Sequence, residues 1–410
     1  MAALMLGIDF SKTDMQVSVW NEGKACAEIY QFYESGEEIL PTIIIAKEDG
    51  TFLVAKEALD YSMQTQEQGI TSLYGNFSNK KISIGNSEKT GNELFAFYLK
   101  EILSIIRKRY SGASIAKIGI TGERMTEKKK EQILEVMQSI GYNKEKLFFS
   151  THADAVLWYE IYGGASKGAS MTLDFDTKGM LGYFVHLGNE VLRRPYYVET
   201  INYSHHMQGS LETISNGKER HRQFINLLEK AIAKKTIARL YVTGNFIDQP
   251  EIITILSSYT GGGRRIFTGR ALYCLGVCYH AVKEKFLDCV IGDGQIFHHV
   301  FLQAYQNGKL GQVCLLKAGT NLSMAHTTIQ VILDDTNELV FRMENIKNGE
   351  KINCTFRPEE FYIIENKTLR LEIELCFLEY ETLILKVRDV GFGEIRLATY
   401  RVWEQMISLV

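Results

Sequence analysis

The chain has 410 residues, of which 45% are hydrophobic and 23% are charged. This length predicts two or three domains, each large enough to bury its own core. The 46 basic and 49 acidic side chains leave a formal charge of -3, so the charge balance favours neither nucleic acid nor an anionic membrane as a partner.

The first predicted element is a strand at the start of the chain. Residues 1–10 are apolar, carry no basic residue before the hydrophobic stretch and reach Asp9 early, which is typical of a buried strand rather than a signal peptide. No stretch approaches the roughly 18 uncharged apolar residues that a membrane helix needs. The seven cysteines are odd in number and indicate a reducing compartment. We therefore expect a cytoplasmic protein with no membrane partner.

Three pairs of similar segments occur in the same order along the chain. Residues 6–15 pair with 172–180, and each is an apolar strand that ends in Asp-Phe, followed by polar residues and a second strand. Residues 115–122 pair with 237–244, and both end in Thr-Gly. Residues 147–151 pair with 265–269, and each is followed by an apolar helical pattern. One such match could arise by chance, but three in one order indicate a duplicated unit.

Each half reads as hairpin, helix, strand, helix, strand, helix. In the first half, Ile133, Met137 and Ile140 at i, i+4 and i+7 give the intervening helix one apolar face. Parallel strands joined through helices form right-handed crossovers. The sequence therefore predicts two α/β units, each with a mostly parallel sheet.

These segments resemble the superfamily of actin, sugar kinases and the Hsp70 ATPase, and they resemble Hsp70 most closely. Residues 6–20 are similar to the first phosphate loop of Hsp70, residues 172–185 fall at the second, and residues 240–246 fall at the adenosine loop. Residues 151–159 and 271–277 look like the two hinge helices. The resemblance covers about residues 1–285. It implies duplicated actin/Hsp70-type (ribonuclease H-like) lobes over residues 1–165 and 166–287.

The resemblance also implies a nucleotide site between the lobes. A hairpin turn can direct backbone N–H groups at phosphate oxygens, and a carboxylate at a strand end can hold the waters of Mg²⁺. The implied cofactor is ATP or ADP with Mg²⁺, held through water by Asp9 and Asp174. The alternative is that each aspartate only closes a β-turn. The implied nucleotide-binding residues are Asp9, Ser11, Lys12, Thr13, Asp174, Thr177, Lys178, Gly179, Gly244 and Asn245.

Two departures from the Hsp70 pattern fall in this implied site. Residues 176–179 (Asp-Thr-Lys-Gly) stand where the family has a glycine run, which lets backbone approach phosphate closely. Thr243 stands where the adenosine loop has its first glycine. We therefore expect at most a weak ATPase and assign no catalytic residue.

The last third of the chain has a different pattern. Apolar residues alternate over 329–333, 339–343, 371–377 and 383–387, with polar turns between these runs. Period-two alternation predicts antiparallel strands with one buried face, so we expect a small β-sandwich domain over 288–410. Residues 371–375 and 383–393 look like strands of the Hsp70 peptide-binding β-domain. The alternative is a β-domain that packs on the core or mediates oligomerisation.

The expected function is that of a divergent, chaperone-like Hsp70 relative, in which lobe closure around a nucleotide is coupled to binding of a protein or peptide. The alternative is a nucleotide-independent scaffold or assembly protein on a degenerate actin/Hsp70 fold. A small-molecule kinase is the third class, and the altered phosphate loop argues against it. The other expected partner is a second copy of the chain in a homo-oligomer, and no nucleic acid is expected.

Overall fold

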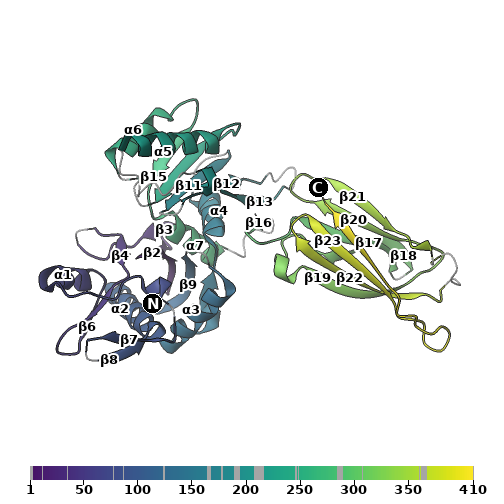
Figure 1. Ribbon diagram of the computed structural model, residues 1–410, viewed down its shortest axis with the longest axis horizontal. Coiled ribbons are helices and arrows are strands. Elements are labelled where there is room, and N and C mark those ends of the chain that lie inside the picture. The colour runs from purple at the N-terminus through teal and green to yellow at the C-terminus, as the bar shows by residue number, and fades with distance from the viewer. Residues whose placement is uncertain are drawn as a thin grey trace. The chain divides into compact units, whose positions relative to one another are not determined.

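The computed structural model describes residues 3–11, 13–34, 36–76, 78–85, 87–122, 125–163, 168–176, 179–188, 194–206, 217–244, 247, 249–283, 290–306, 308–359, 361 and 367–409. Over these ranges the chain is a mixed α/β protein with seven α-helices and several sheets (Figure 1). It divides into two compact units, an N-terminal unit of residues 1–187 and 198–288 and a C-terminal unit of residues 188–197 and 289–410. The expected finer division at residues 165 and 287 stays a prediction. No α-helix within the described ranges combines the length and the apolar character needed to cross a membrane.

The first sheet of the N-terminal unit has the strand order β10-β9-β1-β2-β3, and β4 also pairs with β2. The antiparallel hairpin of β1 and β2 confirms the strand, turn and strand predicted at residues 6–15. Strand β9 runs parallel to β1, and β10 runs parallel to β9. The bounds are β1 (Leu4–Phe10), β2 (Asp14–Asn21), β3 (Cys26–Ile29), β4 (Ile39–Pro41), β9 (Ile115–Gly122) and β10 (Leu147–Phe149).

The second sheet has the strand order β15-β14-β11-β12-β13-β16, where β16 is Val290–Ile291. Strands β11 and β12 form the second predicted hairpin, β14 runs parallel to β11, and β15 runs parallel to β14. The bounds are β11 (Ser170–Asp176), β12 (Gly179–His186), β13 (Tyr196–Asn202), β14 (Arg239–Gly244) and β15 (Arg265–Thr268).

Helices precede the parallel strands, and two small hairpins accompany the first sheet. The α-helices are α1 (Ala55–Thr65), α2 (Gly91–Arg109), α3 (Glu127–Ser139), α4 (His152–Tyr162), α5 (Gly217–Ile232), α6 (Pro250–Ser258) and α7 (Leu272–Lys283). The small antiparallel hairpins are β5 (Ile44–Ala46) with β6 (Phe52–Val54), and β7 (Lys81–Ile84) with β8 (Ser87–Thr90).

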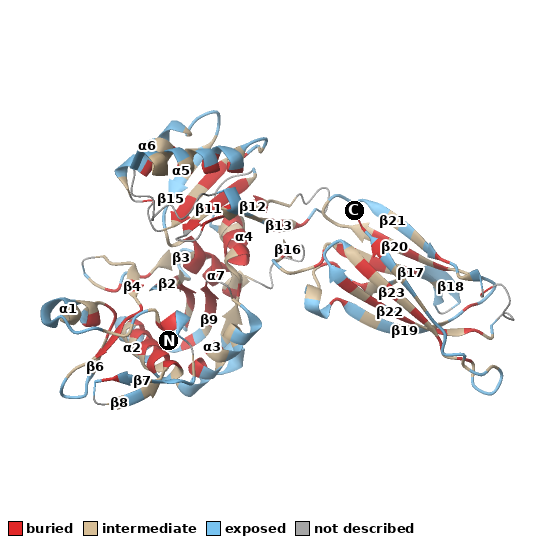
Figure 2. Cartoon of the chain, viewed as in Figure 1, coloured by how far each residue is buried: buried red, intermediate tan, exposed pale blue. Residues whose placement is uncertain are grey.

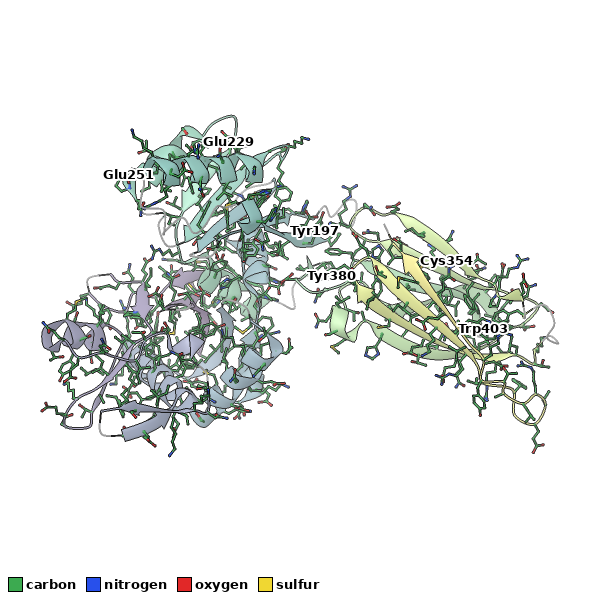
Figure 3. The ribbon with its side chains drawn as sticks, in the orientation of Figure 1. Tyr197, Glu229, Glu251, Cys354, Tyr380 and Trp403 are labelled. Carbon is green, nitrogen blue, oxygen red and sulfur yellow. The ribbon has the colours of Figure 1, made fainter. Side chains whose placement is uncertain are left out.

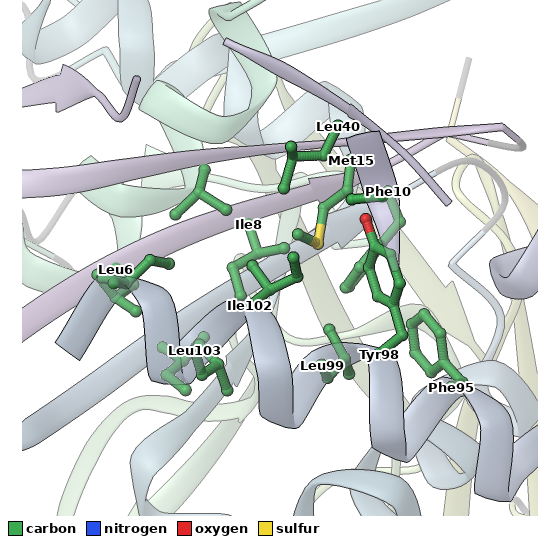
Figure 4. Close-up of a cluster of buried hydrophobic side chains, with 14 of the residues drawn as sticks. Leu6, Ile8, Phe10, Met15, Leu40, Phe95, Tyr98, Leu99, Ile102 and Leu103 are labelled. Carbon is green, nitrogen blue, oxygen red and sulfur yellow. The ribbon is translucent and has the colours of Figure 1, made fainter. Parts of the chain in front are cut away.

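Helix α2 shows how the sequence determines one of these elements. Thr90 caps the helix through a bond from the backbone N–H of Glu93, and the Glu93 carboxylate accepts from the Thr90 N–H, a reciprocal pair that satisfies two otherwise unpaired donors. Its apolar face packs on the first hairpin. Figure 4 shows this cluster, with Leu6, Ile8, Phe10, Met15 and Leu40 from the strands and Phe95, Tyr98, Leu99, Ile102 and Leu103 from α2. Each such side chain contributes about 1.5–3 kcal/mol when fully buried.

Helices α4 and α7 connect the two sheets of the N-terminal unit. Helix α7 follows β15 of the second sheet, yet it packs on β1, β2 and β9 of the first. Helix α4 follows the last strand of the first sheet and contacts β12 of the second, and the two helices pack against each other. A Cβ added to Gly276 of α7 would meet the backbone of Ala155 in α4, so glycine permits this close approach.

The C-terminal unit contains two four-stranded antiparallel sheets, with the orders β18-β17-β20-β21 and β19-β22-β23-β24. Alternate residues from both sheets fill one hydrophobic core, seen as red bands in Figure 2. This arrangement confirms the antiparallel strands predicted from period-two alternation. The bounds are β16 (Val290–Ile291), β17 (His298–Gln306), β18 (Lys309–Leu316), β19 (His326–Ile332), β20 (Leu339–Asn345), β21 (Lys351–Phe356), β22 (Arg370–Glu379), β23 (Thr382–Asp389) and β24 (Val402–Ser408).

Candidate functional site

Asp9 lies near the carboxyl end of β1 and is only 6% exposed. Its register partner on the parallel strand β9 is Thr121. Oδ1 of Asp9 lies 2.8 Å from Nε2 of His152, the first residue of α4. The carboxylate is therefore within hydrogen-bond distance of a side chain of the protein itself.

Asp174 occupies the corresponding place on β11, where its register partner on β14 is Thr243. The hydroxyl of Tyr273, in the first turn of α7, donates a 2.5 Å hydrogen bond to Oδ2 of Asp174. Burial, together with the negative charge of Asp174, holds the pKa of the Tyr273 phenol well above its usual range. The phenol therefore keeps its proton and remains a donor to the carboxylate.

A stacked ring pair joins these two aspartates into one group. The rings of His152 and Tyr273 are parallel to within 7°, and their centroids lie 3.8 Å apart. Asp9, His152, Tyr273 and Asp174 thus form a chain of three contacts, which we call the aspartate cluster. Its members come from β1, α4, α7 and β11.

Sequence reasoning predicted Asp9 and Asp174 as site residues but missed His152 and Tyr273. Both missed residues lie in the first turn of the helix that follows the last strand of each half. A polar ring at that place in both halves was a detectable signal. The contact between the two rings could not be predicted in this way, because it arises from the packing of α4 on α7.

The residues of the first hairpin turn form hydrogen bonds with one another. The backbone N–H of Asp14 donates to Oγ of Ser11 at 3.1 Å, and the backbone N–H of Ser11 donates to the carbonyl of Asp14 at 2.9 Å. The hydroxyl of Thr13 donates to the Asp14 carboxylate at 2.9 Å. Ser11 and Thr13 are therefore engaged within the turn, while Lys12, also predicted for this loop, lies outside the described residues.

The second hairpin turn is packed against Ser204. The backbone N–H of Met180 donates to Oγ of Ser204 at 3.2 Å, and a Cβ added to Gly179 would meet the side chain of Ser204. The space beside Gly179 is therefore occupied by protein. Thr177 and Lys178, the other residues predicted for this loop, lie outside the described residues.

Gly244 ends β14 with φ at +130°, a conformation that L side chains rarely adopt. A Cβ at this position would meet the backbone of Phe175, its register partner on β11. The pairing of β11 with β14 is thus sufficient reason for glycine at position 244. Asn245, the neighbour predicted to share its role, lies outside the described residues.

Protein groups bond to one oxygen of each carboxylate in the aspartate cluster and to one amide of the second hairpin turn. One oxygen of Asp9 and one of Asp174 are each bonded to a protein ring, and the Met180 amide is bonded to Ser204. Among the residues that the structure describes, no three His, Cys, Asp or Glu side chains are grouped so that they could share a metal ion.

A pocket of about 480 Å³ lies elsewhere in the N-terminal unit, beside α2 and α3. Its lining contains none of the predicted nucleotide residues and no member of the aspartate cluster. The lining residues are Ile44, Phe52, Lys89, Asn92, Glu93, Leu94, Ala96, Phe97, Lys100, Glu135, Val136, Ser139 and Ile140.

A buried ion pair connects α4 to the second sheet. Nη2 of Arg239 lies 2.9 Å from Oε2 of Glu160, and both side chains are almost fully buried. Burial raises the pKa of Glu160 to about 7, because the loss of water outweighs the attraction of the Arg239 charge.

Two family models match the chain. Residues 29–288 match a model described as "Family of unknown function (DUF5716) C-terminal", and residues 295–409 match one described as "Domain of unknown function (DUF8552)". A comparison with curated proteins found no match. Because the first model covers more than half of the sequence and contains most of the N-terminal unit, the chain belongs to the DUF5716 family.

Proposed function

We propose that the protein is a nucleotide-independent scaffold or assembly protein on a degenerate actin/Hsp70-type fold. The observation that carries this proposal is the aspartate cluster. In it, His152 bonds to one oxygen of Asp9 and Tyr273 bonds to one oxygen of Asp174, and these are the carboxylates that the resemblance assigns to a hydrated Mg²⁺.

The strand orders support the fold part of this proposal. Each sheet of the N-terminal unit begins from an antiparallel hairpin whose first strand pairs in parallel with a later strand, which then pairs in parallel with a third. Asp9 faces Thr121 and Asp174 faces Thr243 in the same register, each one residue before a Phe-Gly pair. This correspondence agrees with the duplicated actin/Hsp70-type lobes that the sequence predicts.

The rigid connection of the two sheets supports the scaffold part. Hydrogen bonds to charged groups contribute about 1.5–3 kcal/mol each, and stacked ring pairs contribute about 0.5–1.5 kcal/mol beyond the area they bury. The aspartate cluster contains such contacts between elements of both sheets. These contacts favour a fixed arrangement of the N-terminal unit, which would present constant surfaces to a partner.

The second candidate is the nucleotide switch that the resemblance implies. The observation favouring it is that both predicted aspartates do belong to one cluster, as a metal-nucleotide site would require. In this candidate, a chaperone-like cytoplasmic protein binds ATP or ADP with Mg²⁺, hydrolyses ATP weakly or not at all, and couples the bound state to a protein or peptide on the β-domain. His152 and Tyr273 would then have to move away from the carboxylates.

Calorimetry on the full chain separates the two candidates. ATP and ADP, each with Mg²⁺, should give no binding heat and no change in the melting temperature if the scaffold proposal holds. A nucleotide present at about 100 times its dissociation constant would stabilise the folded chain by about 2.7 kcal/mol. Micromolar binding that Asp9→Ala and Asp174→Ala both abolish would overturn the scaffold proposal and establish the switch.

A further inference from the structure

His298 is a buried histidine in the C-terminal unit. It is the first residue of β17, where buried and half-buried side chains alternate, so it points to the same side as Val300 and Leu302 of the core. Only 2% of the residue is exposed. The centroid of its ring lies 6.4 Å from that of Phe377, on β22 of the other sheet. The imidazole therefore lies between the two sheets of the sandwich.

The side chains that form this core are apolar. Met343 of β20 and Leu375 of β22 are among those that point inward from the two sheets. Trp403, labelled in Figure 3, packs against the same core. A polar ring between these sheets has lost the water that it would contact in the unfolded chain, so it needs partners from the protein.

Neither ring nitrogen of His298 has a hydrogen-bond partner among the residues that the structure describes. Two buried rings of the N-terminal unit differ in this respect, since His152 bonds to Asp9 and His280 lies within hydrogen-bond distance of Ser150. An apolar side chain of similar size would fill the place of His298 without two unmet polar atoms. Packing alone therefore does not account for a histidine at this position.

The charged groups around His298 favour its protonated form less than burial opposes it. Glu350, in the turn between β20 and β21, attracts a proton to the ring, but burial has the larger effect and lowers the pKa of His298 below its usual 6.5. Lys347 of the same turn lies over the ring of Phe297. The charged side chains of β20 and β22 alternate with the core residues and so face away from the ring, as Arg342, Glu344, Glu372 and Glu374 do.

We propose that His298 is an acid-sensing group of the C-terminal unit, which is neutral while the sandwich is closed and opens the sandwich when it is protonated at mildly acidic pH. An imidazolium between the two sheets would be a buried charge without a bonded partner among the described residues, which is unfavourable. In the open state the ring reaches water and holds the proton. The inference goes beyond the proposed function and does not depend on it, because it uses the titration of no residue in the N-terminal unit.

The lowered pKa of His298 gives the direction of the pH dependence. An unfolded histidine titrates near pH 6.5, whereas the folded state binds this proton only at lower pH. The contribution of His298 to stability is therefore complete above pH 6.5 and is lost as the pH falls below it. Between pH 7.5 and 5, this linkage raises the equilibrium constant for opening of the C-terminal unit by up to about 30-fold.

The test follows the C-terminal unit separately within the full chain. Three tryptophans occur in the sequence, and Trp403 is the one that lies in the C-terminal unit. In protein labelled with 5-fluorotryptophan, the fluorine NMR signal of Trp403, assigned with Trp403→Phe, reports unfolding of this unit in urea at pH 7.5 and 5. The wild type should show the rise in the unfolding constant, and His298→Gln should remove most of it, because glutamine does not titrate.

His298→Leu is the second variant, which should also lose the pH dependence and should be at least as stable as His298→Gln at both pH values. Two controls lie in the same unit. His326 is exposed on β19, so His326→Gln should behave as the wild type.

His299 is the neighbouring control. It points to the other side of β17, and its Nδ1 accepts a hydrogen bond from the Ala318 N–H at 3.1 Å. Burial lowers its pKa as well, but His299→Gln should keep most of the dependence. A wild type without pH dependence, a dependence that persists in both His298 variants, or one that His299→Gln removes instead would each overturn the proposal.

Discussion

The imidazole of His152 lies flat against the phenol ring of Tyr273, with ring centroids 3.8 Å apart. The two residues lie 121 positions apart in the sequence, in the first turns of helices that follow strands of different sheets. Each ring bonds to an aspartate at the end of a first hairpin strand, His152 to Asp9 and Tyr273 to Asp174. This one contact therefore connects elements that follow the two similar hairpin segments of the sequence.

Removing the Tyr273 hydroxyl should destabilise the protein without disturbing the ring stack. Tyr273→Phe deletes the donor to a partly buried carboxylate, and we expect a loss of about 1.5–3 kcal/mol in the free energy of unfolding. Urea denaturation of the full chain measures this loss. Tyr98→Phe is the matched control, because the equally buried Tyr98 hydroxyl donates to a neutral carbonyl, that of Pro41. It should cost only about 1 kcal/mol. Equal losses in the two variants would contradict the special role given to Asp174.

The raised pKa of Glu160 should make stability depend on pH near neutrality. Because its pKa rises to about 7 in the folded state from a usual 4.5, the folded state binds the proton more tightly than the unfolded state. This contribution to stability is complete below pH 4.5 and is lost as the pH rises through about 7, amounting to about 3 kcal/mol at most. Glu160→Gln should remove the dependence, as measured by urea denaturation between pH 5 and about 8. If Glu160→Gln and the wild type had the same dependence of stability on pH, Glu160 would have to be ionised over the whole range, stabilised by the Arg239 charge.

His280 should produce the opposite dependence at lower pH. Its ring stacks on Trp158, and its Nδ1 lies 3.0 Å from the hydroxyl of Ser150. Burial, with a further contribution from the Lys117 charge, lowers its pKa to about 3. The unfolded state therefore binds the proton first, so this contribution is complete above pH 6.5 and is lost as the pH falls towards 3.

On acidification from pH 6.5 to about 4, protonation linked to His280 should lower the free energy of unfolding of the wild type by about 3 kcal/mol. His280→Gln lacks this contribution, so it should lose less stability over the same range. The replacement amide can still bond to Ser150. The control is His326→Gln, since His326 is exposed in β19 and stays in water in both states. Parallel acid denaturation curves for His280→Gln and the wild type would be inconsistent with a neutral, buried His280.

Close packing of α4 on α7 should make Gly276 sensitive to the smallest substitution. A methyl group at this position would meet the backbone of Ala155, which cannot move without shifting α4. We expect Gly276→Ala to cost at least about 1–3 kcal/mol, seen as a lower melting temperature in calorimetry. Gly217→Ala is the control, because no described residue lies within 4 Å of a Cβ added at that position at the start of α5, and alanine there should be neutral or slightly stabilising. A neutral Gly276→Ala would mean that the two helices are more loosely packed.

Much of the fold could be predicted from local pattern. The two hairpins at β1-β2 and β11-β12 follow from apolar runs that end in Asp-Phe, and the strands of the C-terminal unit follow from period-two alternation. The buried positions Ile133 and Met137 of α3 follow from helical spacing. These features depend on neighbouring residues, which is why sequence alone reveals them.

The candidate site was predicted less completely. The sequence identified Asp9 and Asp174, because each recurs at the same place in a duplicated segment. It gave no account of what bonds to them, since His152 and Tyr273 reach the aspartates only through the packing of α4 against α7. It assigned Gly179 and Gly244 to phosphate and adenosine, which stays a prediction, and it gave no sign that Ser204 and the Phe175 backbone lie beside these glycines.

The two similar hairpins, the α/β character of the first part and the β-strands of the last follow from the amino-acid sequence alone, because each is encoded by a pattern over a few neighbouring residues. The groups that bond to the two aspartates follow from the tertiary structure, since they depend on the packing of α4 and α7, which are far apart in the sequence. A side chain's position in the sequence fixes the strand or helix it belongs to, but its partners are fixed by how those elements pack.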